Sequence, residues 1–69
     1  MLCPRCAQGD VVKAKIKKTG TVLFVCQECE ATWFSQLDIG VVPFLDFGTH
    51  MEEIGLMPLW DELEVIMNK

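Results

Sequence analysis

Two short cysteine motifs, Cys3-Pro4-Arg5-Cys6 and Cys26-Gln27-Glu28-Cys29, decide how this chain folds. They use all four cysteines of the 69-residue sequence. The two residues inside each motif let a short turn aim both thiolates at one point, with backbone N–H groups directed toward the sulfurs. Four converging thiolates form the tetrahedral donor set of a closed structural zinc site. The spacing therefore predicts a structural Zn²⁺ bound by Cys3, Cys6, Cys26 and Cys29.

The length of the chain supports a metal for a separate reason. A core of this size rarely contributes more than about 3–5 kcal/mol, whereas a structural zinc ion supplies about 10–16 kcal/mol of apparent binding free energy. A disulfide scaffold, a redox pair and a rubredoxin-like iron site would use the same cysteines and stay open as alternatives. We favour zinc because no secretory leader is evident at Met1, and the cytoplasm keeps thiols reduced.

The charged residues divide unevenly along the chain. Residues 1–27 carry five basic side chains against Asp10, whereas residues 28–69 carry nine acids against Lys69, within a formal net charge of −4. Such asymmetry bears on the choice of partner rather than on the fold. No apolar run approaches the roughly 20 residues that a membrane span needs. We therefore expect a soluble, cytoplasmic protein with no membrane partner.

The segment between the two motifs predicts a β-hairpin. From Val12 to Ile16, apolar residues alternate with lysines, which is the period of a half-buried strand. Gly20 supplies the positive φ of the turn, and residues 22–26 form the returning strand. Residues 31–35 contain Thr, Trp and Phe and favour a third strand. These segments predict a three-stranded antiparallel sheet.

Beyond a connector over residues 36–43, the spacing of the apolar residues becomes helical in residues 44–69. Thr49 and Glu52 fit a capping box at the start of a first helix, and Gly55 fits the position after its end. The apolar face of this helix comprises Phe44, Phe47, Met51 and Ile54.

A second helix is expected to begin at Pro58, which suits a first helical turn. Its apolar face comprises Leu59, Trp60, Leu63, Ile66 and Met67. We therefore predict one domain over residues 1–69, a small α+β fold stapled by a metal. One or two short helices should follow the sheet and dock on it near Trp33 and Phe34.

Residues 1–35 resemble the zinc-ribbon superfamily in their two C-x2-C motifs and intervening hairpin. The resemblance implies a ribbon fold and the same four cysteine ligands. Many ribbons carry glycine directly after each motif, where this chain has Ala7 and Glu30. Transcript-cleavage ribbons carry an acidic pair at the hairpin tip, and Lys18-Thr19-Gly20 lacks it.

The sequence gives little support to catalysis. A catalytic zinc site keeps one coordination position open for water, and four cysteine ligands leave none. His50 is the single histidine and has no evident nucleophile or base beside it in the sequence. We therefore expect no enzymatic activity, no catalytic residue and no small-molecule substrate.

Acidic residues around large apolar side chains in the second half predict binding of a basic protein. The candidate partner-binding residues are Asp46, Glu52, Glu53, Trp60, Asp61, Glu62 and Glu64. Trp60 suits an interface anchor, although packing in the core is the competing interpretation. The segment 55–64, joined to a ribbon, resembles small bacterial immunity proteins of contact-dependent inhibition systems. That resemblance implies an inhibitor that binds and neutralises a basic nuclease toxin.

Nucleic-acid binding is the alternative function. Lysines on one face of the first strand are suited to contact phosphates. The candidate residues are Arg5, Lys13, Lys15, Lys17 and Lys18. The competing interpretation is that these lysines solvate the outer face of the sheet and protect its edge.

Overall fold

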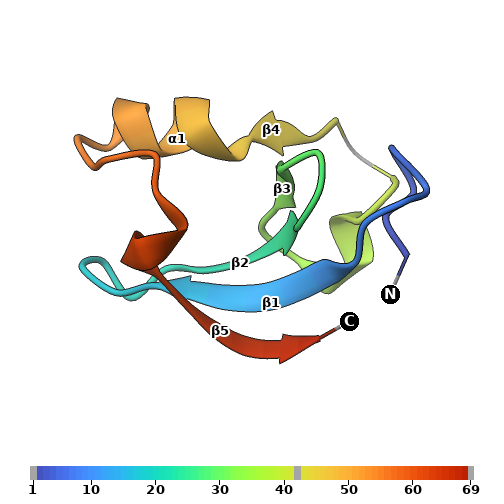
Figure 1. Ribbon diagram of the computed structural model, residues 1–69, viewed down its shortest axis with the longest axis horizontal. Coiled ribbons are helices and arrows are strands. Elements are labelled where there is room, and N and C mark those ends of the chain that lie inside the picture. Colours follow the sequence, from blue (N-terminus) through green and yellow to red (C-terminus); the bar gives the residue numbers. More distant parts are fainter. Residues whose placement is uncertain (1, 42, 69) are drawn as a thin grey trace.

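The hairpin predicted between the cysteine motifs forms the centre of a five-stranded antiparallel sheet (Figure 1). This computed structural model describes residues 2–41 and 43–68, the last two by their backbone alone. Val42 of the predicted connector and Lys69 of the predicted second helix lie outside the described residues. The strand order is β4-β3-β2-β1-β5, so the first hairpin is flanked by later segments of the chain on both sides.

The elements follow one another with short connections. The strands are β1 (Val11–Ile16), β2 (Val22–Cys26), β3 (Ala31–Trp33), β4 (Leu45–Asp46) and β5 (Leu63–Asn68). The helices are the 3₁₀ turns η1 (Gln36–Asp38) and η2 (Trp60–Glu62), and the α-helix α1 (Phe47–Glu53). None of the helices in the described part of the chain has the length and apolarity to cross a membrane.

The central hairpin has the predicted register and turn. Val11 of β1 lies opposite Cys26 of β2, and Lys15 lies opposite Val22. Gly20 has a φ of +77°, and its N–H donates to the C=O of Ile16 at 2.7 Å. This positive φ is accessible to glycine without the steric cost that a side chain would add.

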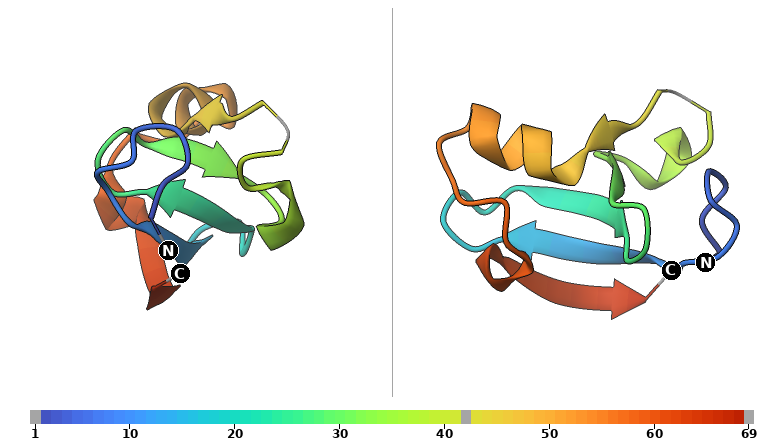
Figure 2. Two further views of the ribbon diagram at one scale, coloured as in Figure 1. Left: turned by 90° about the vertical axis from the view of Figure 1, so that its right-hand side faces the viewer. Right: turned by 45° about the horizontal axis from the view of Figure 1, so that its top comes forward.

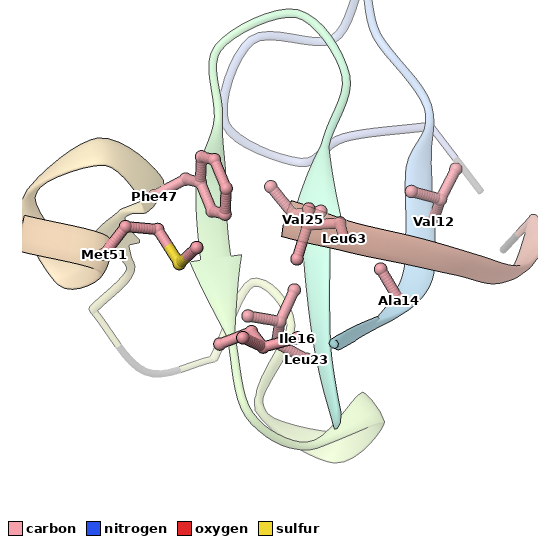
Figure 3. Close-up of a cluster of buried hydrophobic side chains, with 8 residues drawn as sticks. All are labelled: Val12, Ala14, Ile16, Leu23, Val25, Phe47, Met51 and Leu63. Atoms are coloured by element: carbon pink, nitrogen blue, oxygen red, sulfur yellow. The ribbon is translucent and has the colours of Figure 1, made fainter. Parts of the chain in front are cut away.

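Helix α1 lies across one face of the sheet and closes the main core (Figure 2). Phe47 and Met51 of α1 are fully buried against the sheet, as the helical spacing predicted, whereas Phe44 and Ile54 of the predicted face are 39% and 40% exposed. Their partners come from three strands: Val12, Ala14, Ile16, Leu23, Val25 and Leu63 (Figure 3). Burying a large apolar side chain completely contributes about 1.5–3 kcal/mol, so α1 is held by its two inward residues.

The prediction that the helices dock near Trp33 and Phe34 is right for Phe34, whose ring centre lies 5.1 Å from that of His50 in α1. It is wrong for Trp33, which is buried in a second cluster with Phe24 and Ile39.

The predicted capping box at Thr49 is wrong, because the helix begins two residues earlier. Asp46 is the N-cap residue, and its Oδ2 accepts hydrogen bonds from the N–H of Thr49 at 3.0 Å and from its hydroxyl at 3.1 Å. Gly48 therefore lies inside the helix. The N–H of Phe47 donates to the C=O of Glu30 at 3.0 Å, which fixes the first residue of α1 to the sheet.

The predicted end of this helix is confirmed. Gly55 has a φ of +80° and follows the C-cap residue Ile54. Its N–H donates to the C=O of Glu52 at 3.1 Å, and the N–H of Leu56 donates to the C=O of Met51 at 2.8 Å. This pair of bonds is the Schellman arrangement, in which the residue after the glycine packs back on the helix. Leu56 accordingly packs against the main core.

The second predicted helix is wrong, and so is the three-stranded sheet. After the short turn η2, the chain becomes β5 and pairs antiparallel with β1, with Leu63 opposite Ile16. β4 adds a further short strand beside β3. The β-branched Val65 and Ile66 suit a strand, and pairing satisfies the backbone groups of β1 that a helix would leave open. Residues 44–69 therefore contribute two strands as well as a helix.

Candidate metal centre

The four cysteine sulfurs converge between the two turns at one end of the molecule. All four Sγ atoms lie within 4.8 Å of one another. The Sγ atoms of Cys3 and Cys29 are 3.7 Å apart, and those of Cys6 and Cys26 are 3.6 Å apart. A disulfide bond is about 2.0 Å long, whereas a tetrahedron of zinc–sulfur bonds of about 2.3 Å has edges of about 3.8 Å. The spacing therefore fits four thiolates around a metal ion.

Each cysteine turn closes with a backbone hydrogen bond and a left-handed residue. The N–H of Ala7 donates to the C=O of Cys3 at 2.9 Å, and the N–H of Glu30 donates to the C=O of Cys26 at 3.1 Å. Ala7 and Glu30 have φ values of +56° and +62°. These are the two positions at which many ribbons carry glycine. A side chain in this region costs about 1–2 kcal/mol, so both turns are strained at the same point.

Gly9 and Asp10 hold the two turns together. The N–H of Cys3 donates to the C=O of Gly9 at 2.8 Å, and the N–H of Gln27 donates to the C=O of Asp10 at 3.0 Å. A Cβ at Gly9 would lie 2.8 Å from the sulfur of Cys26 and 2.7 Å from the Cβ of Glu28. Glycine is therefore required here by close approach to the metal centre, a need that no local sequence pattern indicated.

Backbone N–H groups and burial set different pKa values for the thiols. The N–H groups of Gly9 and Gln8 lower the pKa of Cys6 to about 6. Burial raises the pKa of Cys26 to about 12, although it accepts from the N–H groups of Cys29 and Glu28. Burial also opposes ionisation of Cys29, but the Ala31 N–H and the Arg5 guanidinium lower its pKa overall. A bound cation would supply the charge that ionises Cys26.

A second apolar cluster packs against the metal centre on the sheet face opposite α1. It comprises Val11, Phe24, Ala31, Trp33 and Ile39 together with Cys3 and Cys26. Ile39 follows η1, so part of the predicted connector covers this face. The cluster shields one side of the sulfurs from water, and Cys3 and Cys26 are both buried.

Arg5 lies at the metal centre rather than beside the lysines. Its guanidinium carbon is 4.4 Å from the centre of the Phe44 ring, which in turn contacts Trp33 edge to face at 6.4 Å. β1 runs from the cysteine turns toward the hairpin tip (Figure 1), which separates Arg5 from Lys17 and Lys18. The structure therefore places Arg5 at one end of β1 and Lys17 and Lys18 at the other, with Lys13 and Lys15 along the strand between them.

Two of the basic candidates are ion-paired with acidic candidates. The Nζ of Lys15 is 3.9 Å from Oε1 of Glu64, and the Nζ of Lys18 is 3.7 Å from Oε2 of Glu62. These contacts lower the positive potential beside β1, and because both lysines are substantially exposed they contribute little stability. Lys13 is half-buried and Lys17 is exposed.

The remaining acidic candidates fall into two groups. Asp46 caps α1 and is engaged within the fold. Glu52 and Glu53 are exposed at the end of α1, and Asp61 is exposed in η2. No ion pair to these last three acids is found over residues 2–41 and 43–68. Fewer acidic candidates are therefore exposed and unpaired in the described part of the chain than the sequence indicated.

Trp60 packs within the protein, as the competing interpretation predicted, and is not an exposed interface anchor. Its ring centre lies 5.8 Å from that of Phe47, and its Nε1 donates to Oε2 of Glu30 at 3.0 Å. The indole therefore has its polar partner inside the fold. Glu30 was not among the candidate site residues. The one signal in the sequence was its place after the second motif, where ribbons carry glycine.

Comparison with known proteins finds no matching family model, no matching curated protein and no matching solved structure. The cysteine cluster and small antiparallel sheet are compatible with a zinc ribbon. Function is therefore inferred from the geometry of this chain alone.

Proposed function

We propose that this protein is a non-catalytic, zinc-stapled binding protein whose acidic C-terminal surface binds a basic protein partner. The observation that carries the proposal is a short segment of exposed apolar residues that acids flank along the chain. Ile54, Met57 and Leu59 are 40%, 61% and 47% exposed, respectively. They follow Glu52 and Glu53 in the chain and precede Asp61. We call these six residues the acidic–apolar surface.

The metal is assigned a structural role because the protein would supply all four ligands. Four cysteine thiolates complete the coordination of Zn²⁺ and leave no position for water or substrate. Thiolate ligands also suit iron, but zinc has no redox chemistry and serves a purely structural site. The ribbon-like arrangement of the two cysteine turns supports the same assignment.

The acidic–apolar surface has the composition expected of a protein interface. Exposed apolar side chains provide the contact area at the centre of an interface, and charged residues at the rim steer the encounter. Glu52, Glu53 and Asp61 would attract a basic partner, because they have no counter-ion among the described side chains. Trp60 would support this surface from below rather than contact the partner, since its indole N–H is bonded to Glu30.

We further propose that the partner is a nuclease toxin neutralised by this protein as an immunity-type inhibitor. Enzymes that cleave RNA or DNA need a basic surface to hold the phosphate backbone. An acidic protein without catalytic residues can cover such a surface and exclude the substrate.

Direct nucleic-acid binding is less well supported. Lys15 and Lys18 are paired with glutamates, and Arg5 lies at the other end of the molecule beside Phe44. A phosphate backbone would also meet the exposed acids of the second half. We therefore keep nucleic acid as an outcome of the test.

The test is a pull-down with the zinc-loaded protein from lysate of its own cells, divided into nuclease-treated and untreated halves. We expect one stoichiometric basic protein in both halves, and this protein should cleave RNA or DNA when freed. Glu53→Lys should weaken its capture, whereas Asp38→Lys, which changes the net charge equally at η1, should not. Nucleic acid recovered only from the untreated half would contradict the proposal and favour the lysines of β1.

A further inference from the structure

The two edges of the sheet differ in how well they are protected from another strand. One edge is β4, which has two residues and continues directly into α1. The other is β5, a six-residue strand whose outer side meets no strand among residues 2–41 and 43–68 (Figure 2). Natural proteins protect long edges with charges, prolines or bulges, because exposed N–H and C=O groups can pair with another chain.

The hydrogen-bond pattern identifies the backbone groups of β5 that face outward. The N–H of Lys17 donates to the C=O of Glu62 at 2.9 Å, so the Glu62 backbone faces β1. In an antiparallel pair the facing groups alternate, so Glu64 faces β1 while Leu63 and Val65 face away. The N–H of Leu63 is already bonded to the C=O of Trp60. The outward groups are therefore the C=O of Leu63 and both the N–H and C=O of Val65.

A β-bulge ends the run of outward-facing backbone groups just after Val65. The register between β1 and β5 shifts between Lys13 and Ala14, so Val65 lies opposite Ala14 and Met67 lies opposite Lys13. Ile66 is the extra residue on β5. Regular pairing with another strand is thus available along 63–65, where Val65 is 49% exposed.

Charge decides which kind of strand fits this edge. Asp61, Glu62 and Glu64 lie at or just before residues 63–65. Glu62 and Glu64 are paired with Lys18 and Lys15, but the Glu64 side chain is still 62% exposed, and Asp61 has no ion pair in the described part of the chain. A second copy of the chain would bring two such acidic sets together and add two net charges of −4. A basic segment would instead place its cations beside these acids.

We propose that β5 binds an extended segment of a basic protein as a sixth strand of the sheet. Residues on one face of this segment would be apolar beside Leu63 and Val65, and those on the other face would be Lys or Arg beside Glu64. The inference rests on the proposed function for the basic character of the partner. It adds a binding mode, since backbone hydrogen bonds provide affinity in strand addition and alternate side chains provide specificity.

The test uses the zinc-loaded, ¹⁵N-labelled protein and a short blocked peptide of alternating valine and lysine. We expect the Val65 amide to shift and to become protected from hydrogen exchange when the peptide binds. A peptide of alternating valine and glutamate should leave this amide unchanged. Equal binding of the two peptides would overturn the charge argument, and binding without protection of Val65 would overturn strand addition.

A matched pair of variants tests the backbone directly. Val65→Pro removes an N–H that faces solvent, so the β1–β5 ladder should survive and unfolding should stay cooperative. The lysine peptide should then bind about tenfold more weakly, which is the upper range for one lost hydrogen bond. Val65→Thr keeps the N–H and should bind as the parent protein does. Equal affinity of the two variants would overturn the inference.

The outcomes separate this inference from the proposed function. Peptide-induced shifts confined to the acidic–apolar surface, with basic-protein capture intact, would remove β5 and leave the proposed function standing. If the pull-down fails but the peptide still protects Val65, the proposed function is wrong and strand addition at β5 stands. Sedimentation showing a dimer that Val65→Pro abolishes would assign the edge to a second copy and overturn the inference.

Discussion

The indole N–H of Trp60 donates a 3.0 Å hydrogen bond to the carboxylate of Glu30, the residue directly after the last cysteine of the second motif. The C=O of Glu30 also accepts from the first N–H of α1. One residue thus joins the metal centre to the helix and to the turn that leads into β5. This link explains why a bulky residue occupies a left-handed position that glycine would fill without strain.

Glycine substitutions at the two left-handed positions should have unequal effects. Ala7→Gly should stabilise the domain by about 1 kcal/mol, because φ near +56° strains alanine and its side chain is exposed. Glu30→Gly relieves the same strain but removes the carboxylate that Trp60 needs, which costs about 1–3 kcal/mol. Glu30→Gly should therefore be neutral or destabilising. Urea unfolding of the zinc-loaded variants measures both, and equal stabilisation would show that the Trp60 bond contributes nothing.

Truncation of Phe47 should be among the most damaging changes in the core. Phe47 is fully buried between α1 and the sheet, and Phe→Ala at such sites costs about 3–5 kcal/mol. Phe44→Ala should cost much less, because this ring is 39% exposed and contacts Arg5 and Trp33 at the surface. Thermal unfolding followed by circular dichroism compares the two variants. Similar losses would contradict the assignment of Phe47 to the main core.

Acid should release the metal and unfold the domain in one transition. The pKa of Cys6 is lowered to about 6, so its ionisation favours the folded state above the unfolded-state pKa, near 9.0. This contribution is lost as the pH falls through about 6. Protons compete with the metal at every thiolate, and most strongly at Cys26, whose pKa burial raises. A chromogenic metal indicator and circular dichroism should change together below about pH 6, and metal loss without unfolding would contradict a structural role.

Much of the fold could be predicted because its signals are local. The alternation from Val12 to Ile16 and the glycines at the hairpin turn and helix end act within a few residues of themselves. β5 could not be predicted in this way. Leu59, Leu63 and Ile66 are spaced as on a helix, and pairing with the distant β1 overrides that preference.

The same distinction between local and long-range signals applies to the candidate site residues. The four cysteine ligands could be predicted from the sequence, because a structural metal site of this kind needs cysteines at a fixed spacing. The acids and lysines were not, because exposed charges serve equally as caps, ion pairs or binding residues. Asp46 caps a helix and Glu64 pairs with Lys15, uses that depend on contacts made only in the folded chain. The Glu30–Trp60 bond joins positions thirty residues apart, and no local pattern indicates it.

The most direct test of the central claim is native mass spectrometry of the protein purified under reducing conditions, before and after chelation and beside Cys26→Ser. We expect one zinc ion for each folded chain, an unfolded charge-state distribution after chelation, and an unfolded, metal-free Cys26→Ser variant. A metal-free chain that stays compact, or a mass showing paired disulfides in place of zinc, would contradict it.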